Sequence, residues 1–188
     1  MDYTEQQQKA LLTMARDQIA GKLSGSHPSV IEDSAFQQQA ATFVTLKKSG
    51  QLRGCIGTLE AIRSLCDDIR YNALAAAFRD TRFPPVTKNE LDDLTIEISI
   101  LDTPEAMLFD TEAELLSQLK PGVDGLILTA GAAGEYRSTF LPQVWQQLPD
   151  PQQFLNQLKL KAGLRTDYWG DDVSAMRYRV VSFAEASN

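Results

Sequence analysis

The stretch LRGCIGTL, residues Leu52–Leu59, constrains the fold of this 188-residue chain more than any other. Arg53 and Cys55 are two positions apart, so an extended segment would place both side chains on one face. Gly54 and Gly57 lack the side chains that would keep a ligand or another backbone away. A cation beside a cysteine favours the thiolate, which is the reactive form. The octet therefore fits a nucleophile site, an anion site or a tightly packed hairpin strand.

The residues around the octet predict an antiparallel hairpin. Residues 41–48, ATFVTLKK, read as a strand, Ser49-Gly50 offers a turn, and residues 51–59 return as the second strand. Residues 94–101, LTIEISIL, alternate clearly between apolar and polar side chains and are the best strand candidate in the chain.

Helix signals flank this hairpin. Thr4 and Gln7 have capping-box spacing at the start of an apolar helical stripe over residues 4–24, and Gly25 and Pro28 end it. Ser64 is the expected N-cap of a second helix over residues 64–79. Residues 80–86, DTRFPPV, cannot be regular because their two prolines exclude both a helix interior and a central strand.

The second half of the chain mixes hairpins with short helices. We expect helices over 111–119, 142–148 and 151–162, a hairpin formed by residues 124–130 and 135–140, and a final strand over 173–183. Strands and helices do not alternate regularly, which favours an α+β fold with an antiparallel sheet and packed helices. One compact domain spanning residues 1–188, with two lobes, is the expected organisation.

Composition limits the classes of partner. The formal net charge is −7 and the isoelectric point is about 4.7, which argues against a nucleic-acid footprint and against an anionic membrane surface. The N-terminus has no apolar core flanked by basic residues, and no apolar run approaches the ~20 residues that span a bilayer. We expect a cytoplasmic protein in which Cys55 and Cys66 are reduced.

Metal and cofactor chemistry have little support in the sequence. His27 is the single histidine, and it stands beside Pro28 in a loop. One histidine with two cysteines eleven residues apart matches no zinc spacing. We therefore expect no metal ligands and no cofactor.

Cys55 is the candidate catalytic residue, a thiol held by a nearby cation in a cleft. Arg53, Gly54, Gly57 and Thr58 are ligand-binding candidates from the same octet. The alternative is a structural cysteine that faces inward, although two glycines would be unusual in a purely structural strand.

The loop RDTRFPP supplies further ligand-binding candidates: Arg79, Asp80, Arg82 and Phe83. A rigid proline turn presents side chains in fixed directions, and Arg79 and Arg82 could join Arg53 as an anion clamp. The alternative is an internal ion pair of Asp80 with Arg53 or Arg82 that fixes the loop.

Thr139 is a last candidate, at the crossing from a strand into the helix expected at 142–148. The N-terminus of a helix can hold an anion. The alternative is a packing junction with Trp145 in the core.

Three segments together resemble the AMMECR family, named for a human chromosomal region: LRGCIGTLEA at 52–61, FRDTRFPPVTKNEL at 78–91 and the stretch 124–163 that contains TFLP. The resemblance covers nearly the whole chain, and the bacterial form, the protein A type of the AmmeMemoRadiSam system, is the most similar. It implies an α+β fold with a larger and a smaller lobe. It also implies genes for a Memo-like protein and a radical-SAM protein nearby, but no reaction.

Three hypotheses about function follow. The first is a module that binds a small molecule or peptide, with an anionic group held by the arginines and with thiol chemistry at Cys55. The second is a non-catalytic accessory protein that engages a Memo-like or radical-SAM partner. The third is a nucleic-acid-associated factor, which the net charge disfavours.

Overall fold

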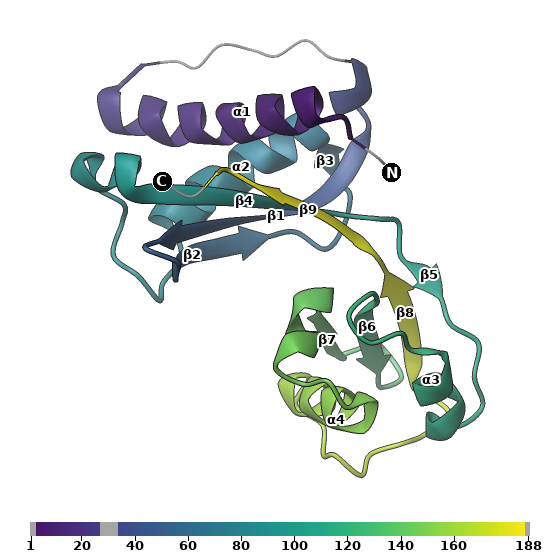
Figure 1. Ribbon diagram of the computed structural model, residues 1–188. Coiled ribbons are helices and arrows are strands. Elements are labelled where there is room, and N and C mark those ends of the chain that lie inside the picture. Colours follow the sequence, from purple (N-terminus) through teal and green to yellow (C-terminus); the bar gives the residue numbers. More distant parts are fainter. Residues whose placement is uncertain (1–2, 27–33, 187–188) are drawn as a thin grey trace. The chain divides into compact units, whose positions relative to one another are not determined.

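The chain forms two compact units, which are described separately. The computed structural model describes residues 3–26 and 34–186. Met1–Asp102 and Val181–Asn188 make the larger unit, and Thr103–Val180 make the smaller unit. Figure 1 shows that each unit combines helices with its own sheet. This arrangement confirms the α+β class and the antiparallel pairing. The expectation that the two units behave as one domain stays a prediction.

The larger unit is built from two α-helices, two 3₁₀ helices and a five-stranded sheet within the described residues. These elements are α1 (Glu5–Ser24), η1 (Ser34–Phe36), β1 (Gln39–Lys48), β2 (Gln51–Gly57), β3 (Arg63–Ser64), α2 (Leu65–Phe78), η2 (Lys88–Asp93), β4 (Leu94–Leu101) and β9 (Val180–Ala184).

Both predicted helix starts are confirmed by their caps. The Thr4 hydroxyl accepts from the Gln7 amide, and the Gln7 side chain accepts from the Thr4 amide, which completes a capping box at α1. The Ser64 hydroxyl accepts from the Asp67 amide at α2. Gly25 ends α1 in the left-handed conformation that glycine adopts without strain.

Strand β1 is the centre of the larger sheet. The strand order is β2-β1-β4-β9, and β3 also pairs with β1. Ser49 and Gly50 both have positive φ angles and form the tight turn between β1 and β2. The β1–β4 register is regular, with Val44 opposite Ile98 and Thr45 opposite Glu97.

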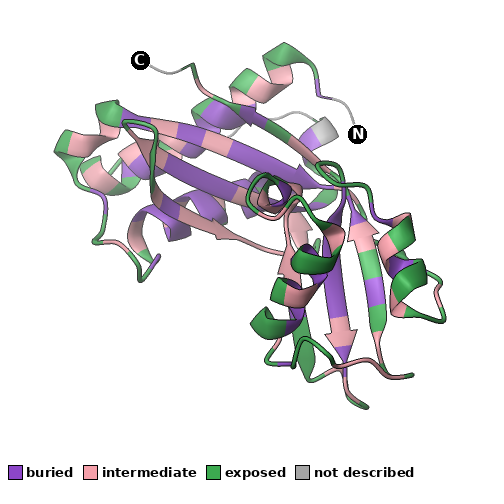
Figure 2. Cartoon of the chain, turned by 60° about the horizontal axis from the view of Figure 1, so that its bottom comes forward, coloured by how far each residue is buried: buried purple, intermediate pink, exposed green. Residues whose placement is uncertain are grey.

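Alternation along β1 and β4 gives the larger sheet two chemically different faces. The even-numbered side chains Val44, Leu46, Ile96 and Ile98 are fully buried and pack with α1 and α2, which cover this face (Figure 1). The opposite face carries Thr45, Lys47, Cys55, Thr95, Glu97 and Ser99. We call this second surface the polar face. Figure 2 shows the buried residues running along the strands and the inward sides of the helices.

The two glycines of the octet lie on different faces and admit different neighbours. A Cβ atom at Gly54 would meet the backbone carbonyl oxygen of Ala76 in α2. A Cβ atom at Gly57 would meet the ring of Phe43, the residue opposite it on β1. Gly54 therefore allows β2 to approach the backbone of α2 closely, and Gly57 allows an aromatic ring to lie over the strand.

The smaller unit is a four-stranded antiparallel sheet of order β5-β8-β6-β7 with helices on one face. Trp145 stacks on Phe154 at 3.8 Å between ring centroids, and its indole N–H donates to the Asp124 carbonyl at 2.7 Å. The elements are β5 (Glu105–Ala106), α3 (Glu112–Gln118), β6 (Gly125–Ala130), β7 (Tyr136–Phe140), η3 (Pro142–Gln146), α4 (Pro151–Lys161) and β8 (Ser174–Tyr178).

The strand expected near the C-terminal end differs from the sequence expectation. The strand expected over 173–183 is two strands, and Arg179 separates them. β8 pairs with β5 and β6 in the smaller unit, whereas β9 pairs with β4 in the larger unit. No glycine or proline separates the two strands in the sequence, so the pattern alone did not reveal the change of sheet. The 3₁₀ helix η2 and the short strands β3 and β5 were not expected either.

We predict that Gly54→Ala destabilises the larger unit by about 2 kcal/mol or more, because backbone atoms of α2 cannot yield to the new Cβ. Gly57→Ala should be less damaging, since only the Phe43 side chain must shift. Urea unfolding of both variants measures the difference. Equal and small losses would show that neither glycine is needed for close packing.

Candidate functional site

The polar face brings four reactive or charged side chains into adjacent positions. Thr45 of β1 lies opposite Cys55 of β2 on one side and opposite Glu97 of β4 on the other. The Thr45 hydroxyl donates to the Cys55 sulfur at 3.3 Å, and the Lys47 ammonium pairs with the Glu97 carboxylate at 2.7 Å. A thiol, a hydroxyl, a carboxylate and an ammonium thus lie side by side on three strands. We call these four residues the Cys55 row.

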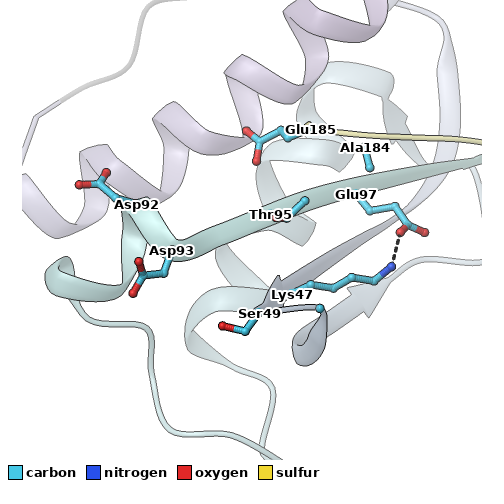
Figure 3. A pocket seen from close by; sticks show the side chains of 9 residues that line it. Lys47, Ser49, Asp92, Asp93, Thr95, Glu97, Ala184 and Glu185 are labelled. Atoms are coloured by element: carbon cyan, nitrogen blue, oxygen red, sulfur yellow. Dashed lines mark hydrogen bonds and ion pairs between the residues drawn. The ribbon is translucent and has the colours of Figure 1, made fainter. Parts of the chain in front are cut away.

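A hollow adjoins the row at its Lys47–Glu97 end. Its volume is about 610 Å³, and Thr95 and Ala184 form part of its floor on β4 and β9. Figure 3 shows the Lys47–Glu97 ion pair at one side of this hollow, with Asp93 and Ser49 at the other. The small Ala184 side chain leaves space beside Glu97, so a ligand could lie in the hollow next to the row.

The Cys55 backbone is held from the free edge of β2. The Cys55 N–H donates to the Asp80 carboxylate at 2.9 Å, and the Cys55 carbonyl accepts from the Arg82 guanidinium at 3.1 Å. Arg82 also donates to both carboxylate oxygens of Asp80, at 2.9 and 2.7 Å. These hydrogen bonds from Arg82 hold the pKa of Asp80 far below its usual range. The internal ion pair that was the alternative for this loop is therefore present, with Arg82 as its cation.

Arg53 is directed away from the thiol by an irregularity in β2. The register shifts between Leu46 and Lys47, so Arg53 is the extra residue of a β-bulge and has no partner across the ladder. Its guanidinium donates to both carboxylate oxygens of Glu90 in η2, at 3.1 and 3.2 Å. This pairing, helped by the Thr87 amide, lowers the pKa of Glu90 to about 2.

Thr58 belongs to a buried polar network beside α2. Asp68 is fully buried and accepts hydrogen bonds from the hydroxyls of Thr58 and Thr42, at 2.6 and 2.8 Å, and from Arg63 at 2.9 Å. Asn72, also fully buried, donates to Asp68 and to the Thr42 carbonyl. The Thr58 hydroxyl therefore points toward α2.

The other candidate residues have local partners. The Arg79 guanidinium lies over the Tyr71 ring at 5.6 Å, and the Arg82 guanidinium lies over the Phe83 ring at 5.5 Å. Thr139 belongs to the smaller unit, where its hydroxyl hydrogen bonds with the Leu126 carbonyl and the Tyr178 hydroxyl.

The described part of the chain offers neither a cluster of metal ligands nor a membrane-spanning helix. Among residues 3–26 and 34–186, no three histidine, cysteine, aspartate or glutamate side chains are grouped so that they could hold a metal ion. None of the described helices is both long and apolar enough to cross a membrane. His27 lies outside the described residues.

Sequence reasoning found Cys55 but missed its neighbours Thr45, Glu97 and Lys47. Part of the signal was present, because polar side chains stand at alternate positions in 94–101 and at Thr45 and Lys47. The missing information was the register, which decides that Thr45 stands between Cys55 and Glu97. No local pattern specifies which residues of two distant strands face each other.

We predict an acid dependence of stability that runs through Glu90. Its pKa of about 2 lies below the ordinary value of 4.5, so the folded protein binds this proton less readily than the unfolded chain. The stabilisation by the ionised Glu90 is complete above about pH 5. It is lost as the pH falls from the ordinary pKa of 4.5 towards the pKa of about 2 in the folded protein. Glu90→Gln should lose about 2 kcal/mol at pH 6 and show a smaller further loss at pH 2.5, measured by urea unfolding.

Asp93→Asn is the matched control for this prediction, because Asp93 lies in the same 3₁₀ helix but is 64% exposed and 4.0 Å from Lys48. It should change stability by at most a few tenths of a kcal/mol. The same acid slope in wild type and Glu90→Gln would contradict the assignment.

Comparison with known proteins accounts for nearly the whole chain. The AMMECR1 family model matches residues 12–183. A protein of Methanothermobacter thermautotrophicus is 38% identical over 182 residues, which cover 94% of this chain and 93% of the relative. A Thermotoga maritima protein is 40% identical over 162 residues, covering 85% and 86%.

A solved structure agrees with these matches. The crystal structure of the uncharacterised protein PH0010 from Pyrococcus horikoshii has a TM-score of 0.83 and 32% sequence identity, and the match covers 95% of this chain and 91% of that one. The expected family and fold are confirmed. With the family model spanning both units, the chain belongs to the AMMECR1 family.

Proposed function

We propose that the larger unit binds a small polar molecule or a peptide at its polar face, with the Cys55 thiol in contact with the ligand. The observation that carries the proposal is the Cys55 row beside a hollow of about 610 Å³. Ligand sites commonly combine a concavity with a few convergent polar groups, and both features occur here on one face of one sheet.

Thr45 supports a chemical role for the thiol. Its hydroxyl donates a hydrogen bond to the Cys55 sulfur at 3.3 Å, so a polar group already contacts the sulfur atom. Cys55 is partly exposed, whereas Cys66 is 3% exposed in the apolar core. Of these two cysteines, Cys55 is therefore the accessible one.

The sequence suggested an anionic ligand, but the pairing of the arginines does not require one. Arg53 and Arg82 each pair with a carboxylate, so neither offers an uncompensated charge to an anion. The hollow is lined by four carboxylate residues and one lysine. A neutral or cationic polar group fits this lining better than an anion, and the anionic ligand stays a prediction.

The alternative is an accessory role in which the same face engages a Memo-like or radical-SAM protein. This partnership, the cytoplasmic location and the absence of nucleic-acid binding stay predictions. A pull-down with each partner protein, using wild type and Glu97→Gln, separates the alternatives, because a protein partner seated on the polar face should be weakened by the substitution.

We predict that iodoacetamide alkylates Cys55 at least about tenfold faster than Cys66 at pH 7.5, because Cys55 is partly exposed whereas Cys66 is buried. Thr45→Val should slow the Cys55 reaction about fivefold, which corresponds to about 1 kcal/mol, the net value of a typical hydrogen bond. Mass spectrometry of the labelled peptides measures both rates.

Thr45→Ser keeps the hydroxyl and is the control, so its Cys55 rate should stay near that of wild type. Equal rates for Cys55 and Cys66 would remove the thiol from the proposal. Amide NMR spectra recorded with a library of polar fragments and dipeptides then test binding itself. The proposal requires shifts that cluster at Thr45, Cys55 and Glu97, and a clean screen would contradict it.

A further inference from the structure

We propose that Asp80 and Arg82 form an edge clamp, an ion pair that hydrogen bonds the main chain of Cys55 in place of a neighbouring strand and so fixes the thiol on the polar face. This inference rests on the proposed function of the Cys55 row. It assigns Asp80 and Arg82 a positioning role, which differs from the ligand-binding role expected from the sequence.

The geometry of the clamp matches what a strand would supply. At an edge strand, alternate residues direct both the N–H and the C=O groups away from the sheet. Cys55 is such a residue. Its N–H donates to the Asp80 carboxylate at 2.9 Å, and its carbonyl accepts from the Arg82 guanidinium at 3.1 Å. One acceptor and one donor thus replace the two groups that a paired residue would offer.

The clamp is itself held rigidly. Asp80 is 6% exposed and accepts from the Arg82 backbone amide as well as from two guanidinium nitrogens. The loop turns at the Phe83 amide, which donates to the Asp80 carbonyl at 3.1 Å, and returns to α2 where the Val86 amide donates to the Ala77 carbonyl at 2.8 Å. Two prolines between these bonds restrict the chain further.

The clamp has a second effect on the β2 edge. A peptide that added to β2 as a new strand would need the Cys55 N–H and C=O groups, which are already bonded. A ligand of the Cys55 row must therefore approach across the face of the sheet. The same ion pair positions the thiol and excludes strand addition at that point.

Amide hydrogen exchange tests the clamp without any ligand. In wild type, the outward-facing amide of Cys55 should exchange as slowly as that of Ile56, which lies within the β1–β2 ladder. Asp80→Asn and Arg82→Gln should each speed exchange at Cys55 by about tenfold while leaving the amide of Ile98 in the central sheet unchanged.

Alkylation as a function of pH separates positioning from charge. Asp80→Asn removes a negative charge near the thiol and Arg82→Gln removes a positive one, so a purely electrostatic role would move the midpoints of the two pH profiles in opposite directions. Release of the main chain should instead raise the plateau rate at high pH about threefold or more in both variants, where the thiol is fully ionised. Opposite midpoint shifts with unchanged plateaus would overturn the proposal.

The chain provides a matched control in Arg165 and Asp167. This pair has the same two-residue spacing and the same two-point geometry, at 2.9 and 2.7 Å, but its side chains are 85% and 66% exposed. Asp167→Asn should leave Cys55 exchange and alkylation as in wild type.

The outcomes distinguish this inference from the proposed function. If both clamp variants fail to fold, the wild-type exchange pattern decides, because an unprotected Cys55 amide overturns the clamp by itself. If the Cys55 amide is protected from exchange but the Cys55 thiol alkylates no faster than that of Cys66, the edge clamp is supported as a structure that caps the β2 edge. The thiol role in the proposed function is then contradicted.

Discussion

The pairing of β1 on both of its sides is the constraint on which the larger unit depends. Because β1 lies between β2 and β4, its residues 43–48 each have a fixed neighbour on both strands. Alternation then sends Val44 and Leu46 toward the helices and Thr45 and Lys47 toward the polar face. A slip of one residue would exchange the two sets and place charged groups against α1 and α2. The apolar core and the Cys55 row are therefore two results of one register.

The charged side chains around residues 52–59 mostly hydrogen bond the main chain or one another. Asp80 and Arg82 meet the Cys55 main chain, and Glu90 joins the bulge residue Arg53 to η2. Burial of a carboxylate is favourable only when hydrogen bonds replace the lost water, and each of these carboxylates receives several. The arginines near Cys55 in the sequence are thus explained by a structural role around the thiol at least as well as by a role in ligand binding.

Local chemistry was predictable from the sequence, whereas long-range placement was not. The caps at Thr4 and Ser64 and the turn at Ser49-Gly50 depend on neighbouring residues, so the sequence predicted these boundaries to within two residues. The partner of Arg82 was among the alternatives because Asp80 is two residues away. The pairing of Arg53 with Glu90 joins residues 37 apart and follows from a bulge that has no sequence signature here.

Strand β9 gives the larger unit a discontinuous sequence. Its residues pair with β4 although they are distant in the chain: Ser99 and Ser182, whose hydroxyls are in contact, are 83 positions apart. Glu185 ties the end of the strand to Arg16 of α1. The smaller unit is thus an insertion between two paired strands. On the ribosome, the smaller unit emerges completely before the larger sheet can receive its last strand. The larger sheet is consequently completed only after the smaller unit has been synthesised, and the hollow beside Ala184 forms only once that strand has docked.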